Sequence, residues 1–236
     1  MVEEAGIHLE EIDRAIAGVS DFRDRLSGMV RIAASDHAAQ TVIYPALSGV
    51  LREFPDIQLE LLVDNALTDL AADQCDAGVR LGEHLAQDMV AVRIGPDQRL
   101  AIAGSPDYLS RNGRPDTPDD LINHNCLGVR LETHGNIYAW EFEKNGKEIN
   151  VRPQGQFVSN DPYQLVNFCV DGIGLACLQE SYFEKHLASG KLERVLEDWC
   201  DPYTGYYLYY PSRRQPTAAF RVVLDALRRQ AAQFAA

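Results

Sequence analysis

From Gly28 onward, the chain alternates between short apolar segments that suit β-strands and longer segments that suit helices. The runs "MVRIAA", "IQLELLV" and "AGVRL" are typical of buried strands, and residues 38–54 have helical spacing that is interrupted near Pro45. Strands and helices in alternation indicate an α/β fold. The 236 residues are enough for two such lobes of roughly 100 residues each.

The second half of the chain continues this pattern with new elements. Asn145 and Gly146 predict a tight hairpin turn between two strand-like runs. Asp161 suits the start of a helix, Gly172 suits its end, and residues 218–234 predict a final amphipathic helix. Because no low-complexity linker divides the chain, we expect two α/β lobes joined by extended crossings, with a ligand-binding cleft between them.

The first 26 residues have a different pattern, with a single apolar stripe at intervals of three and four. A helix of about 25 residues would be a rod of roughly 38 Å. So narrow a stripe favours pairing with a partner helix over packing on its own domain. The stripe consists of Val2, Ala5, Leu9, Ile12, Ile16, Val19 and Leu26.

Acidic residues outnumber basic ones, since 35 aspartates and glutamates against 22 lysines and arginines give a net charge of −13. Such a surface repels the phosphate backbone of nucleic acids, so we do not expect this polypeptide to bind DNA by itself. The sequence has no apolar run of about 18 residues that could span a membrane. The first residues lack the basic flank and apolar centre of a signal peptide, and a cytoplasmic location is expected.

The five cysteines are an odd number and form no C-x-x-C pair, which argues against disulfide and zinc frameworks. We expect buried free thiols, with a redox switch between Cys169 and Cys177 as the minor alternative. His124 and Cys126 lack the second pair of ligands that a metal site needs. No metal and no cofactor are expected.

Ser35, Asp36 and His37 follow the first strand directly and are the three residue types of a hydrolase triad. Consecutive residues point in different directions, so they do not line up a proton relay, and no G-x-S-x-G motif accompanies them. Ser35 or Asp36 suits the N-cap of the following helix instead. The N–H groups and the positive dipole end of that helix would favour an anion in the cleft, although the charge of Asp36 opposes one.

Two further candidates follow strands of the first lobe. Arg80 ends a strand on the edge where α/β sheets bind ligands, and its alternative role is an ion pair with Asp76 or Asp36. Asn65 comes directly after the second strand and is a turn residue or a ligand contact. Both side chains are expected near the cleft.

Three candidates belong to the second lobe. Asn160 and Asp161 begin a helix, so each is a cap, a ligand contact or both. Two helix N-termini from opposite lobes would form a polar clamp for a small anion or amide. Arg130 lies on an expected loop beside the cleft, where it tunes selectivity or is simply solvated.

Several blocks of the chain, taken in order, resemble the effector-binding domain of LysR-type transcriptional regulators. The similarity runs through "GMVRIAAS", "YPALSGVLREFPDIQLEL" and "CDAGVRLG", continues in "SPDYLSRNGRPDTPDDLINHNCL" and "SNDPYQLVNFCVDGIGLACL", and ends in "LYYPSRRQPTAAFRVVLDAL". These blocks cover nearly everything from Gly28 to the C-terminus. The chain departs from the family after "GLAC", where a proline is common and Leu178 and Gln179 stand instead.

The resemblance implies two Rossmann-like subdomains, similar to type II periplasmic binding proteins, preceded by a linker helix. Residues 1–27 would be the end of the helix that pairs subunits into a dimer or tetramer. Residues 28–103 with 206–236 would form the first subdomain, and residues 104–205 the second. The winged helix-turn-helix of the family is missing from this sequence, so DNA is expected as a partner only through that missing part.

The resemblance also implies small-molecule contacts at Ser35, Asp36 and His37, and it places Ser105 at the crossing between the lobes. We therefore predict a sensor without enzymatic activity, in which an effector such as an anionic metabolite shifts the lobes and changes transcription. The first alternative is a free-standing solute-binding protein, which the N-terminal helix and the lack of a secretory leader argue against. The second is a hydrolase that uses Ser35, for which no supporting motif is present.

Overall fold

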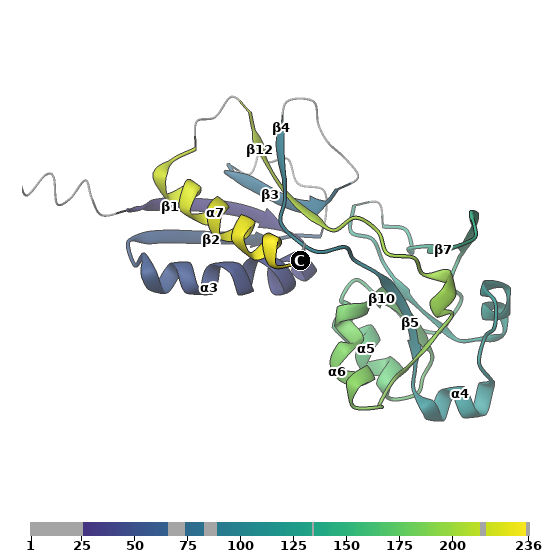
Figure 1. Ribbon diagram of the computed structural model, residues 1–236. Helices are drawn as coiled ribbons and strands as arrows, with labels where there is room; N and C mark the ends of the chain where they lie inside the picture. Colours follow the sequence, from purple (N-terminus) through teal and green to yellow (C-terminus); the bar gives the residue numbers. More distant parts are fainter. Residues whose placement is uncertain (1–25, 66–73, 83–88, 134, 213–215, 235–236) are drawn as a thin grey trace, which may run out of the picture.

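The computed structural model describes residues 26–65, 74–82, 89–133, 135–212 and 216–234. These residues form two α/β lobes that are joined by two extended connections (Figure 1), which confirms the predicted fold class. The expected linker helix lies outside the described residues except for its last two positions, and so does the short helix expected at residues 68–73. Within the described ranges, no helix is long and apolar enough to cross a membrane.

The first lobe is built on a five-stranded sheet in the order β2-β1-β3-β12-β4. β1 pairs in parallel with β2 and β3, whereas β12 runs antiparallel to both β3 and β4. The last strand of the chain is thus inserted into the sheet that the first four strands form. The elements of this lobe are β1 (Gly28–Ala34), α2 (Asp36–Ala38), η1 (Ala39–Ile43), α3 (Tyr44–Glu53), β2 (Ile57–Val63), β3 (Ala77–Leu81), β4 (Met89–Arg93), β12 (Tyr206–Pro211) and α7 (Ala218–Gln233).

The helix after β1 contains a wide turn directly before Pro45. Residues Ala39–Ile43 form a π-helical turn between the α-helical segments α2 and α3. Proline has no N–H group to donate, and its ring crowds the carbonyl group one turn earlier. A widened turn therefore lets the helix pass the proline without ending, and the predicted interruption near Pro45 is confirmed in this form.

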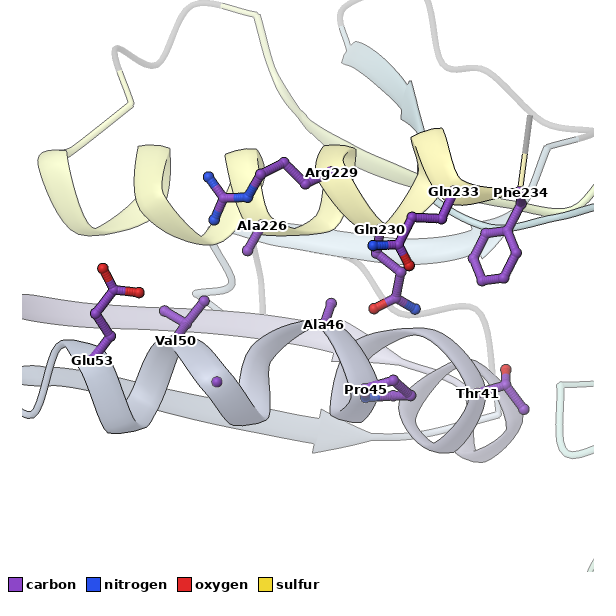
Figure 2. Close-up of a pocket in the computed structure, with 11 residues that line it drawn as sticks. Thr41, Pro45, Ala46, Val50, Glu53, Ala226, Arg229, Gln230, Gln233 and Phe234 are labelled. Carbon is purple, nitrogen blue, oxygen red and sulfur yellow. The ribbon is translucent and has the colours of Figure 1, made fainter. Parts of the chain in front are cut away.

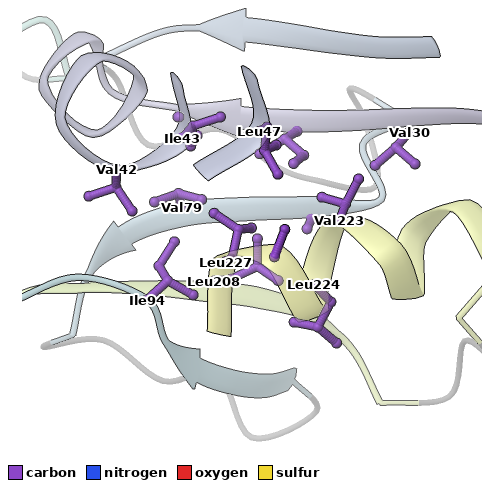
Figure 3. Packing of buried hydrophobic residues seen from close by; sticks show 14 of the residues in the cluster. Val30, Val42, Ile43, Leu47, Val79, Ile94, Leu208, Val223, Leu224 and Leu227 are labelled. Atoms are coloured by element: carbon purple, nitrogen blue, oxygen red, sulfur yellow. The ribbon is translucent and has the colours of Figure 1, made fainter. Parts of the chain in front are cut away.

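Apolar side chains between the sheet, α3 and α7 make the core of the first lobe (Figure 3). Val79 and Leu208, from the neighbouring strands β3 and β12, are completely buried. Leu47 of α3 and Leu227 of α7 close the same cluster from the helical layer. Because β12 and α7 come from the far end of the chain, this core is complete only when both ends of the sequence meet.

The second lobe has a sheet in the order β11-β5-β10-β6-β9. β10, β6 and β9 are parallel, whereas β5 runs antiparallel to β10 and β11. Leu175 and Cys177 belong to one apolar cluster and Ala176 and Leu178 to another, so helices and the hairpin cover both faces of β10. The elements are β5 (Leu100–Gly104), α4 (Pro106–Asn112), η2 (Pro118–Asn123), β6 (Cys126–Val129), β7 (Trp140–Lys144), β8 (Lys147–Val151), β9 (Val158–Ser159), α5 (Pro162–Val170), β10 (Leu175–Gln179), α6 (Glu180–Ala188), β11 (Glu193–Val195) and η3 (Glu197–Trp199).

The hairpin β7–β8 turns at Asn145 and Gly146, as predicted. Lys144 and Lys147 are the last paired residues, which leaves a two-residue turn. Asn145 has a φ of 54° and Gly146 a φ of 75°, so both have the left-handed conformation of a type I′ turn. The turn fixes the register that places Glu143 opposite Glu148.

Both sheets turn the carboxyl ends of their parallel strands toward the junction of the lobes. The chain leaves the first sheet at the end of β4 and enters the second at the start of β5, which runs against its neighbours. In open α/β sheets, ligands bind beyond these carboxyl ends. The connectivity therefore directs the ligand-binding edges of both lobes at each other.

The structure corrects the expected subdomain boundary after residue 103. The strand "LAIAG" (β5) pairs with β10 and β11 of the second sheet, so the first sheet ends at Arg93 and the crossing precedes Leu100. A short apolar run does not indicate which sheet will pair with it, because pairing depends on distant strands. β4 and β11 were not predicted from the sequence.

Candidate ligand-binding site

Ser35 caps the helix that follows β1, as predicted. Its side-chain Oγ accepts a hydrogen bond from the Ala38 N–H group, with an N···O distance of 3.2 Å. The Asp36 N–H group donates to Oδ1 of Asn65 at 3.1 Å, so Asn65 supports the same helix start from the end of β2. Two N–H groups that were expected to face an anion are thus satisfied by side chains of the protein.

His37 is 3% exposed and has a hydrogen-bond partner in each lobe. Its Nδ1 atom is 2.8 Å from the Tyr206 hydroxyl group of the first lobe, and its Nε2 atom is 2.5 Å from Oγ of Ser181 in the second. Burial lowers the pKa of His37 to about 4, although the charge of Asp36 acts in the opposite direction. The imidazole is therefore neutral at pH 7, where one ring nitrogen donates and the other accepts.

A second bond between the lobes lies beside the first. The Tyr182 hydroxyl group donates to Oδ2 of Asp36 at 2.7 Å. The Tyr182 ring also lies 5.0 Å from the His37 ring, centroid to centroid. Burial is the main cause that raises the pKa of Tyr182, so its hydroxyl group stays protonated and keeps this bond. The first residues of α6 thus hold the second lobe against the start of α2.

Ser35, Asp36 and His37 bond to different partners. Ser35 caps its own helix, Asp36 accepts from Tyr182, and His37 contacts Tyr206 and Ser181. The serine within reach of His37 is therefore Ser181 of the other lobe. The geometry agrees with the expectation that the three consecutive residues do not form a relay.

Arg80 lies near this group at the end of β3. Its Nη1 atom donates to the Val79 carbonyl group at 2.9 Å. Partial burial lowers the pKa of the Arg80 guanidinium, and the nearby charge of Asp64 acts against this effect. Of the two expected partners, the Asp76 carboxylate accepts the Arg31 N–H group at 2.8 Å, and Asp36 accepts the Tyr182 hydroxyl group.

The three candidates of the second lobe lie together at the ends of β6 and β9. The Arg130 N–H group donates to the Ser159 carbonyl group at 2.9 Å, and the Asp161 N–H group donates to Ser159 Oγ at 3.0 Å. Asp161 caps α5 through Tyr163, whereas exposed Asn160 donates to Glu132 Oε1 at 2.7 Å. The cap at this helix is therefore Asp161, and Asn160 fastens the loop that follows β6.

Ser105 does not lie at the crossing between the lobes, and this part of the predicted site is wrong. Its Oγ atom caps α4 by accepting from the Tyr108 N–H group at 3.2 Å. In the pairing of β5 with β10, Leu100 lies opposite Gln179 beside α6, and Ala103 lies opposite Ala176 farther away. The direction of β5 therefore carries Ser105 to the end of the sheet that faces away from the first lobe.

The five cysteines and His124 are held inside the protein. All five cysteines are buried and free, as predicted. Burial raises the pKa of Cys126 and of Cys169 to about 12, so both are thiols at pH 7. His124 is 3.2 Å from the Tyr108 hydroxyl group through Nδ1, and no cluster that could hold a metal ion occurs among the described residues.

One large cavity lies between α3 and α7 (Figure 2). It measures about 530 Å³ and is lined by Pro45, Ala46 and Val50 on one side and by Ala226 and Gln230 on the other. None of the predicted site residues lines it. This cavity belongs to the first lobe alone.

The second cavity measures about 710 Å³ and lies at the junction of the lobes. Its wall includes Leu81 of the first lobe, Tyr203 of the returning connection, and the β7–β8 hairpin of the second lobe. The predicted site residues do not line it, but their neighbours do, since Leu81 follows Arg80 and Leu131 follows Arg130. Neighbouring residues of a strand point to opposite sides of the sheet. The predicted residues and the residues that line the cavity therefore lie at the same strand ends but on opposite sides.

Ser181, Tyr182 and Tyr206 at the junction and the acidic wall of this cavity were not predicted from the sequence. Ser181 and Tyr182 follow the buried strand β10 just as Ser35 follows β1, so the same rule could have found them. Glu141, Glu143 and Glu148 alternate along the predicted hairpin and could have been placed on one face. Tyr206 carried no such signal, because its position depends on the insertion of β12 beside β3.

Comparison with known proteins gives a family match over residues 23–232, to the model described as the LysR substrate binding domain. A candidate transcriptional regulator of Pseudomonas aeruginosa is 43% identical over 223 residues, which cover 94% of this chain and 73% of that protein. The HTH-type transcriptional regulator PgrR of Escherichia coli is 40% identical over 223 residues, covering 94% of this chain and 75% of the relative.

Solved structures share the fold at lower identity. The full-length structure of AphB, a Vibrio cholerae virulence activator, matches with a TM-score of 0.76 and 23% identity, over 97% of this chain and 77% of that one. CrgA of Neisseria meningitidis matches with a TM-score of 0.74 and 23% identity, over 97% of this chain and 76% of that one. Both similarities bear on the two-lobed architecture.

Proposed function

Because the chain belongs to the LysR-type transcriptional regulators and contains their substrate-binding domain, we propose that it senses a small-molecule effector in the cavity at the lobe junction. One observation carries this proposal: residues of both lobes and of the returning connection line a single cavity of about 710 Å³. Small-molecule sites have volumes of this order. A ligand in this cavity would contact both lobes and one of the segments that connect them.

Direct polar contacts join the lobes near the predicted site. They include the bond from Tyr182 to Asp36 and the bond between His37 and Ser181. Each such hydrogen bond contributes about 1 kcal/mol, so a ligand with a modest preference for one lobe arrangement changes the balance between arrangements. We propose that this change reaches the partner subunits of an oligomer and, through a DNA-binding segment, transcription in the cytoplasm.

The polar candidates have two different roles in this proposal. Ser35, Asn65 and Arg80 of the first lobe, with Arg130 and Asn160 of the second, contact the effector at the rim of the cavity. Each of these five side chains also makes a hydrogen bond within the protein. The side chains of Asp36, His37 and Asp161 position the two rims through their own bonds.

The test is a thermal-shift screen of cytosolic metabolites with two matched variants. A true effector stabilises the protein by about 2.7 kcal/mol at a hundredfold excess over its dissociation constant. Leu131→Trp places a large ring in the cavity wall, whereas Leu51→Trp makes the same change on α3, and the two leucines are 39% and 40% exposed. The stabilisation should vanish in the first variant and persist in the second. A compound that stabilises both variants equally binds elsewhere, and the assignment of this cavity then fails.

A further inference from the structure

Several carboxylate groups give the wall of the junction cavity a negative charge. Glu141, Glu143 and Glu148 lie on one face of the β7–β8 hairpin, where Glu143 is directly opposite Glu148. Asp201 of the returning connection adds a fourth carboxylate. Among the described residues that line this cavity, none is a lysine, arginine or histidine.

These carboxylates have no counter-ion within the described part of the chain. The ion pairs that form there are made by other acids, such as Asp198 with Lys144. Like charges placed directly opposite each other on a hairpin destabilise it. A bound cation would remove this repulsion, whereas a bound anion would increase it.

The remaining wall suits an organic cation better than a metal ion. The described acidic residues include no group of three close enough to hold a metal, so the charges are spread along the wall. Tyr138, Phe142 and Tyr203 add aromatic surface between them, whereas the Trp199 ring already has Lys144 Nζ 5.1 Å from its centroid. Ammonium and guanidinium groups bind aromatic rings and carboxylates together.

Trp199 supplies an independent indication of a ligand. This residue lines the cavity and is 9% exposed, and its indole N–H group has no hydrogen-bond partner among the described residues. A buried donor without a partner costs free energy, which an acceptor on a ligand restores. The ligand should therefore carry a carbonyl or similar acceptor as well as its positive charges.

We propose that the junction cavity binds an extended organic cation, with one or two ammonium or guanidinium groups against Glu141, Glu143, Glu148 and Asp201 and an acceptor for Trp199. This inference rests on the proposed function of the cavity and defines the chemical class of its effector. It replaces the anionic metabolite that the helix N-terminus had suggested, because an anion would face four carboxylates. Arg80 and Arg130 at the rim would then contact uncharged acceptor groups of the ligand and not its cationic groups.

The test uses lysine amide, which carries two ammonium groups and a carbonyl, in titration calorimetry with the full chain. Norleucine amide, which lacks the side-chain ammonium group, should bind at least about fivefold more weakly, and adipate should not bind. Added salt should weaken the binding of lysine amide. Failure of lysine amide to bind at millimolar concentration, or binding of adipate with equal affinity, overturns the proposal.

Charge-matched variants identify the site. Glu143→Gln with Glu148→Gln should raise the dissociation constant of lysine amide about tenfold, and the unliganded variant should melt at an equal or higher temperature because a repulsion is removed. Glu53→Gln with Glu184→Gln removes two charges outside this cavity and should leave the affinity unchanged. Equal affinities in both double variants overturn the assignment.

Two results separate this inference from the proposed function. If Leu131→Trp abolishes the effect of a neutral or anionic effector that the glutamine pair still binds, the cavity is the effector site and the cation class is wrong. If lysine amide binds through Glu143 and Glu148 but no compound in this cavity alters transcription in a reporter strain with the complete regulator, the cation site stands and the sensing function fails.

Discussion

His37 shows how a single side chain links stability to the contact between the lobes. It is neutral in the folded protein, because burial lowers its pKa to about 4, whereas an unfolded histidine has a pKa of about 6.5. Between these two values the unfolded state binds the extra proton and the folded state does not. Stability is therefore at its full value above pH 6.5 and falls as the pH drops toward 4.

At pH 5.5, this effect should cost the parent protein about 1 kcal/mol relative to pH 7.5. His37→Gln removes the titrating group, so its loss of stability between the two pH values should be smaller by that amount. Urea unfolding at both pH values measures the difference. Equal losses in the parent and in His37→Gln would contradict the role of His37.

At the scale of elements, two glycines with open space around them differ in backbone conformation, since one has a positive φ and the other is helical. Gly146 sits in the hairpin turn with a φ of 75°, whereas Gly49 lies inside α3. A Cβ atom added at either position would meet nothing within 4 Å. The backbone conformation alone therefore decides what a methyl group does at each place.

Gly146→Ala should destabilise the protein by about 1 kcal/mol, because L-residues avoid positive φ. Gly49→Ala should stabilise it by about 0.5 to 1 kcal/mol, because alanine restricts the unfolded chain and suits a helix. Denaturant midpoints of the two variants measure these changes. Shifts of the same sign would show that the type I′ turn or the helix is not formed as described.

At the scale of the whole molecule, the lobes meet through the start of α2 and the start of α6. Ser181 and Tyr182 supply the bonds to His37 and Asp36. Two extended segments connect the lobes (Figure 1), and we do not expect them to fix the distance between the lobes by themselves. The separation of the lobes therefore depends in part on these polar contacts.

Ser181→Ala combined with Tyr182→Phe removes both hydroxyl groups from the junction. The unliganded variant should populate more open arrangements, and its radius of gyration in small-angle X-ray scattering should exceed that of the parent. Tyr163→Phe is the control, because this half-exposed ring packs on Tyr182 without a hydrogen bond to the first lobe. A scattering curve identical to that of the parent would show that these bonds do not hold the lobes.

Local chemistry was sufficient to predict much of the fold and part of the site. Helix caps at Ser35 and Asp161, the hairpin turn at Asn145 and the interruption at Pro45 follow from residues that are close in sequence. The position of Ser105 was predicted wrongly because it depends on the direction in which β5 pairs. The sequence also suggested that the N–H groups at the start of α2 would bind an anion. Asn65 and Ser35 already accept hydrogen bonds from two of these groups.

The amino-acid sequence alone determined the alternation of strands and helices, the family resemblance and the residues that begin and end most elements. These properties arise from interactions over a few residues, whose outcome hardly depends on the rest of the chain. Only the tertiary structure decided that β12 lies between β3 and β4, that His37 meets Ser181, and that four carboxylates share one cavity. Such contacts join residues that are far apart in the sequence, and strand pairing and the packing of two lobes select them.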